Sequence, residues 1–175
     1  MKAHMLRDVL HASPGEQVVK ASQTLLECIK EDPKTCAEDK DAYWEGLVVR
    51  LLQSGQGVVR QCGLEMACLL LSHHPPLGRK WRQSGILPLL PCMNEDTRYA
   101  MATLLCMADP SSSDAMLNLN MLSLAGRELT MHTSPKEVLG YARDMLECVL
   151  HLHPEWICKV HPDVLRVYLS FRLGT

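Results

Sequence analysis

The chain contains 175 residues, of which 47% are hydrophobic and 22% are charged, an ordinary composition for a globular protein. Its formal net charge of −2 excludes a global basic field that would attract nucleic acid or an anionic membrane. No apolar run approaches the roughly 18 residues that a membrane span requires. The first residues also lack the apolar core and cleavage site of a signal peptide. We therefore expect an intracellular protein without a membrane span, and the sequence does not distinguish cytoplasm from nucleus.

The eight cysteines could in principle form the disulfide framework of a secreted protein. That interpretation requires a small, loop-rich chain, whereas this chain is of medium size and patterned for helices. Without an export signal, reduced thiols in the cytosol or nucleus are the better expectation.

A repeat of four segments organises the chain. The segments 18–28, 58–68, 96–106 and 138–148 align without gaps, and each ends on a cysteine. Eight residues before that cysteine stands a basic residue in three segments and Gly140 in the fourth. A proline follows each cysteine, and because the residue before proline avoids the helical region, it predicts the end of a helix of about four turns. The four prolines are Pro33, Pro75, Pro110 and Pro154.

Two of these helices share a start signal. Ser13 and Ser134 are each followed by proline, and Glu16 and Glu137 stand three residues after the serines. This pattern predicts a serine cap, proline in the first turn and a glutamate that closes a capping box.

A second set of helical segments precedes each repeat helix. In chain order we expect a helix at 2–12 and then helices at 41–53, 79–93, 114–131 and 162–173. The chain then consists of four pairs, each made of one helix of this set followed by a repeat helix. The last helix of the set, at 162–173, has no repeat helix after it. We expect one domain, 1–175, with approximate units 1–33, 34–75, 76–110, 111–154 and an incomplete unit 155–175.

Several segments carry a resemblance to known helical repeats. The run 94–104, Asn-Glu-Asp-Thr-Arg-Tyr-Ala-Met-Ala-Thr-Leu, looks like the start of a HEAT second helix, in which an acidic turn precedes a Val-Arg-x-x-Ala-type run. The runs 58–60 and 18–20 match the same position. The run 84–90, Ser-Gly-Ile-Leu-Pro-Leu-Leu, resembles the armadillo Gly-Ile-Pro-x-Leu helix with one residue more before the proline. Gly140 and the turn 53–57, which lacks an acid, depart from the family pattern.

The resemblance to HEAT and armadillo repeats covers nearly the whole chain. It implies an all-α fold, a right-handed α-α superhelix of about four and a half helical pairs. Stacked repeats leave a long concave surface that commonly binds other proteins. We therefore expect a scaffold or adaptor that binds a partner segment along the groove of its second helices. The residues expected to contact it are Lys20, Gln23, Glu27, Arg60, Gln61, Glu65, Arg98 and Arg143.

A basic row is the most specific surface feature. If the repeats stack regularly, Lys20, Arg60 and Arg98 line up, and such a row suits an acidic or extended peptide. The alternative is a solvated helix face without a specific partner. A nucleic-acid-associated module is the runner-up function, since the segment 79–82 adds three basic residues around Trp81.

The sequence contains little evidence for a metal site or for catalysis. Thiol and imidazole are zinc ligands, and the weak candidate for a zinc site is the set Cys148, His151, Cys158 and His161. The repeat already explains Cys148, however, so we expect no metal and no cofactor. No P-loop, dinucleotide fingerprint or nucleophile elbow is present, and we expect no enzymatic activity.

The last helix has no partner in the repeat pattern. Terminal repeats normally carry a polar outer face, yet this helix would leave apolar residues partly bare. We expect its face to pack on another chain or on further repeats of a longer solenoid. The residues concerned are Val164, Leu165, Val167, Leu169 and Phe171.

Overall fold

The computed structural model describes residue 11 and residues 15–131 and 134–173. Every regular element in this part of the chain is a helix, so the all-α prediction is confirmed. The chain divides into two compact units, Met1–Ile86 and Leu87–Thr175, and each is described by itself below. The helix expected at 2–12 lies outside the described residues.

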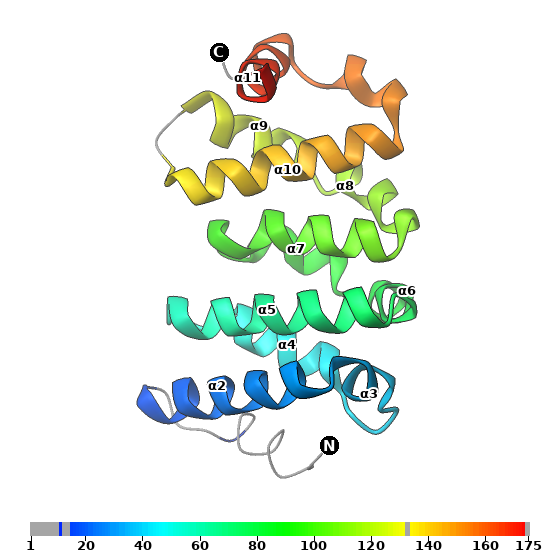
Figure 1. The fold of residues 1–175 in the computed structure, drawn as a ribbon. Helices are drawn as coiled ribbons and strands as arrows, with labels where there is room; N and C mark the ends of the chain where they lie inside the picture. The colour runs from blue at the N-terminus through cyan, green and yellow to red at the C-terminus, as the bar shows by residue number, and fades with distance from the viewer. Residues whose placement is uncertain (1–10, 12–14, 132–133, 174–175) are drawn as a thin grey trace. The chain divides into compact units, whose positions relative to one another are not determined.

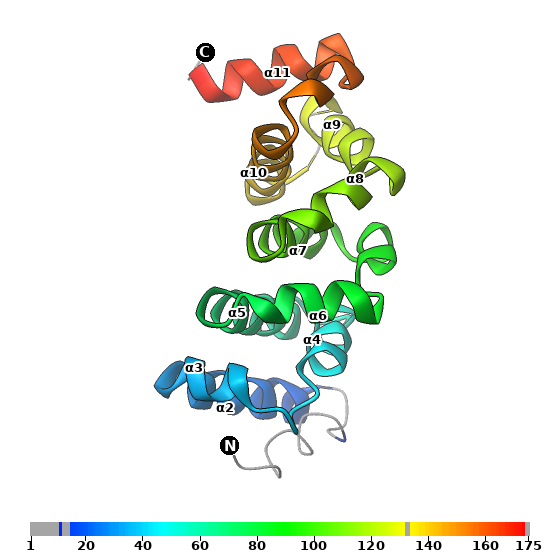
Figure 2. The same cartoon turned by 90° about the vertical axis from the view of Figure 1, so that its right-hand side faces the viewer.

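The first unit consists of α2 (Glu16–Glu31), α3 (Pro33–Glu38), α4 (Trp44–Leu52), α5 (Gly57–His73) and α6 (Pro76–Ser84). The long helices α2 and α5 lie side by side and run in the same direction, and α4 packs against α5 (Figures 1 and 2). This packing buries the apolar faces of all three helices. The fully or almost fully buried side chains of these helices include Leu25, Ile29, Trp44, Leu47, Leu51, Leu52, Met66 and Leu70.

Two local features fix the contact between α4 and its neighbours. A Cβ at Gly63 would stand 2.9 Å from Leu51 Cβ, so only glycine permits the close approach of α5 to α4. The buried Trp44 donates its indole N–H to the Cys36 carbonyl at 2.8 Å, which ties α4 to the short helix α3. The helix α3 is not predicted by the sequence patterns described above.

The second unit contains α7 (Glu95–Ala108), α8 (Asp114–Asn118), α9 (Met121–Met131), α10 (Lys136–Leu152) and α11 (Pro162–Leu173). Three 3₁₀ helices connect them: η1 (Leu87–Cys92), η2 (Pro110–Ser113) and η3 (Pro154–Lys159). The long helices α7 and α10 lie side by side and run in the same direction, α9 packs on α10, and α11 packs on α9 (Figures 1 and 2). Each unit therefore contains one adjacent pair of the predicted repeat helices.

The proline stops are confirmed at all four long helices. The residue before each proline is the C-cap, and its φ lies between −150° and −132° with ψ between 73° and 96°. These extended values follow from the clash between the proline ring and a helical residue before it. The C-cap residues are Asp32, His74, Asp109 and His153.

For two of the helices expected before the repeat helices, the predicted bounds are wrong. The helix expected at 79–93 ends at Ser84, because Gly85 adopts a left-handed backbone with φ 97° and the chain continues as η1. The helix expected at 114–131 is interrupted between α8 and α9, where Asn120 has φ 58°. Glycine and asparagine tolerate this conformation, so each residue can break a helix that apolar periodicity would continue. The helices at 41–53 and 162–173 are confirmed as α4 and α11.

The capping box predicted at Ser134 is wrong, and the serine of the other predicted box, Ser13, lies outside the described residues. Gly15, with φ 102°, is the N-cap of α2, and Pro135 is the N-cap of α10. The Ser134 hydroxyl donates to the Glu128 carboxylate instead of capping α10. That carboxylate also accepts the Tyr99 hydroxyl at 3.2 Å, so a tertiary hydrogen bond between α7 and α9 has displaced the local cap.

The apolar face of α11 is partly exposed, as predicted. Leu169 is 43% and Leu173 is 72% exposed. Val164, Leu165 and Val167 are half-buried, and the side chain of Phe171 is not among those described. What covers this face stays a prediction.

Two glycines of the second unit should respond oppositely to alanine. A Cβ at Gly126 on α9 would lie 2.7 Å from Val164 Cγ2 on α11, so Gly126→Ala should destabilise the protein by about 1–3 kcal/mol. A Cβ at Gly140 on α10 meets nothing within 4 Å, so Gly140→Ala should stabilise it by about 0.5–1 kcal/mol. Urea unfolding of both variants measures the two shifts. A Gly126→Ala protein as stable as the wild type would contradict the close packing of α9 and α11.

Candidate functional site

A groove of about 400 Å³ runs between α2 and α5 in the first unit. Each helix contributes one stripe at spacing i, i+3, i+4 and i+7, the spacing of side chains that share a helix face. Four of the eight predicted contact residues are brought together here, namely Gln23, Glu27, Gln61 and Glu65. We call this surface the α2/α5 groove; its remaining lining residues are Leu26, Lys30, Val58 and Cys62.

The α2/α5 groove has an apolar floor. Leu26 and Cys62 are each only 6% exposed, and Val58 at the edge is 53% exposed. An apolar side chain placed here would cover exposed apolar surface, which is the favourable term in most protein association.

The rim of the α2/α5 groove is acidic. Lys30 Nζ lies 3.2 Å from Glu27 Oε1 and 3.8 Å from Glu65 Oε2. The hydrogen bond that Lys30 donates to Glu27, and then the negative charge of Glu27, raise the pKa of Lys30. Since one lysine faces two glutamates, the groove keeps a formal charge of −1. All three side chains are exposed, so these ion pairs add little stability and leave the glutamates available to a partner.

The predicted basic row has a more local role than expected. Arg60 donates from Nη1 to the Ser54 carbonyl at 2.9 Å. Arg98 donates from Nε and Nη2 to the Met93 carbonyl at 3.0 and 2.7 Å. Both arginines are half-buried, and each guanidinium binds the turn before its own helix. The carbonyl of Ser54 thus takes the place of the acid that the turn 53–57 lacks.

The other two predicted contact residues lie apart from this groove's lining. Lys20 is exposed near the start of α2. Arg143 is on α10 in the second unit, where its Nη2 lies 3.4 Å from Asp144 Oδ1. A continuous basic row of Lys20, Arg60 and Arg98 stays a prediction.

The weak zinc candidate is not assembled. His161 Nδ1 accepts the Asp163 N–H at 3.2 Å, and the Cys158 thiol donates to the Glu155 carbonyl at 2.9 Å. Cys148 is half-buried on α10, and His151 is exposed. Across residues 15–131 and 134–173, no group of three or more His, Cys, Asp or Glu side chains is placed to hold a metal ion.

A serine, a histidine and a carboxylate meet at the end of α10. His153 Nε2 lies 2.7 Å from Ser113 Oγ, and its Nδ1 lies 3.3 Å from Glu155 Oε1. Trp156 stacks on the imidazole with ring centroids 3.9 Å apart and 9° between the planes. The sequence offered no signal for this cluster, because Ser113 and His153 are 40 residues apart and match no motif.

The serine, histidine and carboxylate follow one another as in the catalytic triad of hydrolases. The burial and hydrogen bonds of this cluster, however, fit a structural role. Ser113 is fully buried, which denies a substrate access to its oxygen. Its hydroxyl donates to the Pro110 carbonyl at 2.6 Å and therefore accepts a hydrogen bond from His153. Asp114 Oδ1 also lies 3.3 Å from Nε2. The cluster holds the end of α10 against the start of α8.

The comparisons with known proteins add no relative. No family model, no curated protein and no solved structure matches the chain significantly. The resemblance to HEAT and armadillo repeats therefore stays a prediction from the sequence. In the described part of the chain, no helix combines the length and apolar character needed to cross a bilayer.

The eight cysteines should differ sharply in reactivity. Cys68, Cys92 and Cys158 are exposed, whereas burial raises the pKa of the Cys106 thiol to about 12. Because the thiolate is the nucleophile, brief iodoacetamide treatment of the native protein near pH 8 should alkylate the exposed three first. Cys106 should react only after unfolding. Peptide mapping by mass spectrometry measures the order, with urea-unfolded protein as the control. Rapid native alkylation of Cys106 would contradict the burial of its side chain on α7.

Proposed function

We propose that the protein is a protein-interaction module, a scaffold or adaptor, in which the α2/α5 groove receives a short segment of a partner protein. The observation that carries the proposal is the combination of an apolar floor and an acidic rim on two adjacent repeat helices. Binding surfaces of this kind use a few anchoring side chains on a shaped surface and need no reactive group.

The groove's charge specifies the partner's chemistry. An apolar side chain would rest on Leu26 and Val58, and a lysine or arginine would lie near Glu27 and Glu65. The expectation of an acidic segment does not suit this groove, because its formal charge is −1 and like charges across an interface oppose binding. We therefore assign a basic, partly apolar segment to the α2/α5 groove. The acidic rim also opposes the alternative of nucleic-acid binding at this surface.

The proposed architecture is the right-handed superhelix of stacked HEAT- or armadillo-like pairs. Two features support it. In each unit, adjacent repeat helices run in the same direction (Figure 1), and all four repeat helices end by the same proline stop. An adjacent parallel pair of second helices is what stacking of two-helix repeats produces.

The proposal predicts that the groove selects basic peptides with an apolar anchor. We would select peptides on the wild-type protein by phage display and measure their binding by fluorescence anisotropy. The Glu27→Gln, Glu65→Gln double variant removes both charges with little change of shape. Its affinity for the selected peptides should fall about tenfold, which corresponds to about 1.4 kcal/mol.

The matched control is the Glu31→Gln, Glu38→Gln double variant. It changes the net charge equally at two exposed positions of the same unit, outside the groove lining. Its affinity should stay within about twofold of the wild type, because distant exposed charges are screened by salt. Selected peptides that bind the groove variant and the wild type equally well would overturn the proposal.

A further inference from the structure

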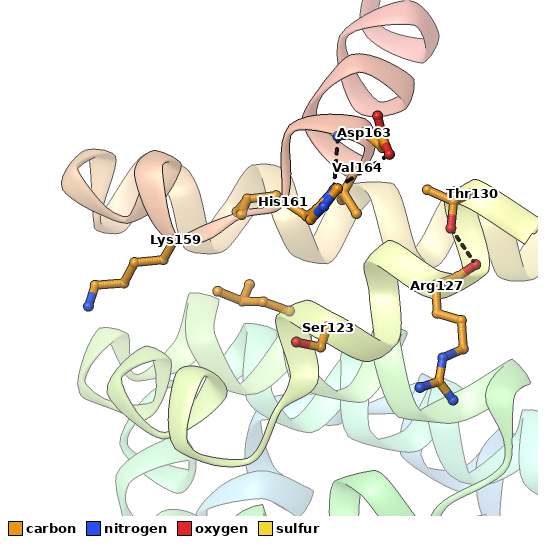
Figure 3. A pocket seen from close by; sticks show the side chains of 9 residues that line it. Ser123, Arg127, Thr130, Lys159, His161, Asp163 and Val164 are labelled. Carbon is orange, nitrogen blue, oxygen red and sulfur yellow. Dashed lines mark hydrogen bonds and ion pairs between the residues drawn. The ribbon is translucent and has the colours of Figure 1, made fainter.

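A second hollow of about 570 Å³ lies in the second unit. It is bounded by α9 on one side and by the segment that leads from the end of η3 into α11 on the other (Figure 3). We call it the α9/α11 hollow. Its lining residues are Leu122, Ser123, Arg127, Thr130, Lys159, Val160, His161, Asp163 and Val164.

The base of the α9/α11 hollow is apolar and firmly placed. Leu122 is 7% exposed, and Val160 and Val164 are half-buried. Val164 lies directly over Gly126, which lets α11 approach α9 closely. The Thr130 hydroxyl donates to carbonyls of its own helix at 3.0 and 3.2 Å, so it is not directed to a ligand.

The charges of the hollow do not cancel. Asp163 Oδ1 lies 3.4 Å from Arg166 Nη2, and its Oδ2 lies 3.7 Å from His161 Nδ1. The lining carboxylate is therefore paired with Arg166, which lies outside the lining. Arg127 and Lys159 are exposed, and neither side chain has an ion-pair partner among the residues described.

The two cationic side chains lie at opposite edges of the hollow. In Figure 3, Arg127 extends from α9 at one end, Lys159 extends at the other, and Ser123 lies between them. Charged groups so separated do not converge on one small anion, as a phosphate clamp would require. They suit an elongated ligand that carries negative charges at both ends and rests on the apolar base.

We propose that the α9/α11 hollow binds an extended acidic peptide segment of a partner protein. Carboxylates of the segment pair with Arg127 and Lys159, and an apolar side chain between them covers Leu122, Val160 and Val164. Nucleic acid fits less well, because the lining contains no Phe, Tyr or Trp on which a base could stack, whereas its aliphatic base suits an apolar side chain. This proposal concerns a different surface from the α2/α5 groove and a partner of opposite charge, so either can fail alone.

The test uses a fluorescein-labelled pool of short peptides built from glutamate, aspartate and leucine, with anisotropy measured on the full chain at physiological salt. The wild type should bind the acidic pool saturably. Binding should fall at least about tenfold in the Arg127→Glu, Lys159→Glu variant, because like charges then face the ligand at both ends. Far-UV circular dichroism and urea unfolding of the variant should match those of the wild type, which shows that the variant is folded whether or not the α2/α5 groove binds peptides.

The matched control reverses two exposed lysines outside the hollow, in a Lys34→Glu, Lys136→Glu variant with the same net charge. It should keep its affinity for the acidic pool within about twofold, because neither lysine lines the hollow and salt screens exposed charges. Absence of saturable binding by the wild type, or equal losses in both variants, would overturn the proposal. A single-stranded oligonucleotide that binds more tightly than the acidic pool and depends on Arg127 and Lys159 would also overturn it, in favour of nucleic acid.

Discussion

The clash between a proline ring and a helical residue before it is the constraint on which the two units depend. It forces Asp32, His74, Asp109 and His153 into extended backbone, so each of the four repeat helices has its last helical residue two positions before a proline. Helices of similar length can then lie side by side within each unit over most of their extent. The groove of the first unit lies between two such helices, α2 and α5.

Backbone carbonyls outside the helices determine which basic side chains remain available to a partner. The carbonyls of Ser54 and Met93 lie in turns where no helix satisfies them, and a buried polar group without a partner is costly. Arg60 and Arg98 bind these carbonyls. Their guanidinium groups therefore stabilise the turns, and the charged lining of the α2/α5 groove comes from Glu27, Glu65 and Lys30 instead.

The sequence predicted what depends on neighbouring residues. Helical periodicity and the prolines at the helix ends predict the four long helices. The helical spacing also predicts that Gln23 and Glu27 share a face of α2 and that Gln61 and Glu65 share a face of α5. It failed where distant residues compete with a local rule. Ser134 bonds to Glu128 rather than capping α10, and Ser113 meets His153 across 40 residues. The left-handed turn at Asn120 has no signal strong enough to override the apolar pattern around it.

The formal net charge of −2 does not predict the charge of an individual surface of the protein. At a Debye length of about 8 Å, a partner responds to the few charges within its own contact area. In the first unit those charges are Glu27 and Glu65, only partly balanced by Lys30. In the second unit they are Arg127 and Lys159, while Asp163 is already paired. A nearly neutral chain can thus offer two surfaces of opposite sign, and the pairing of each charged group, rather than its count, decides which surface a partner finds.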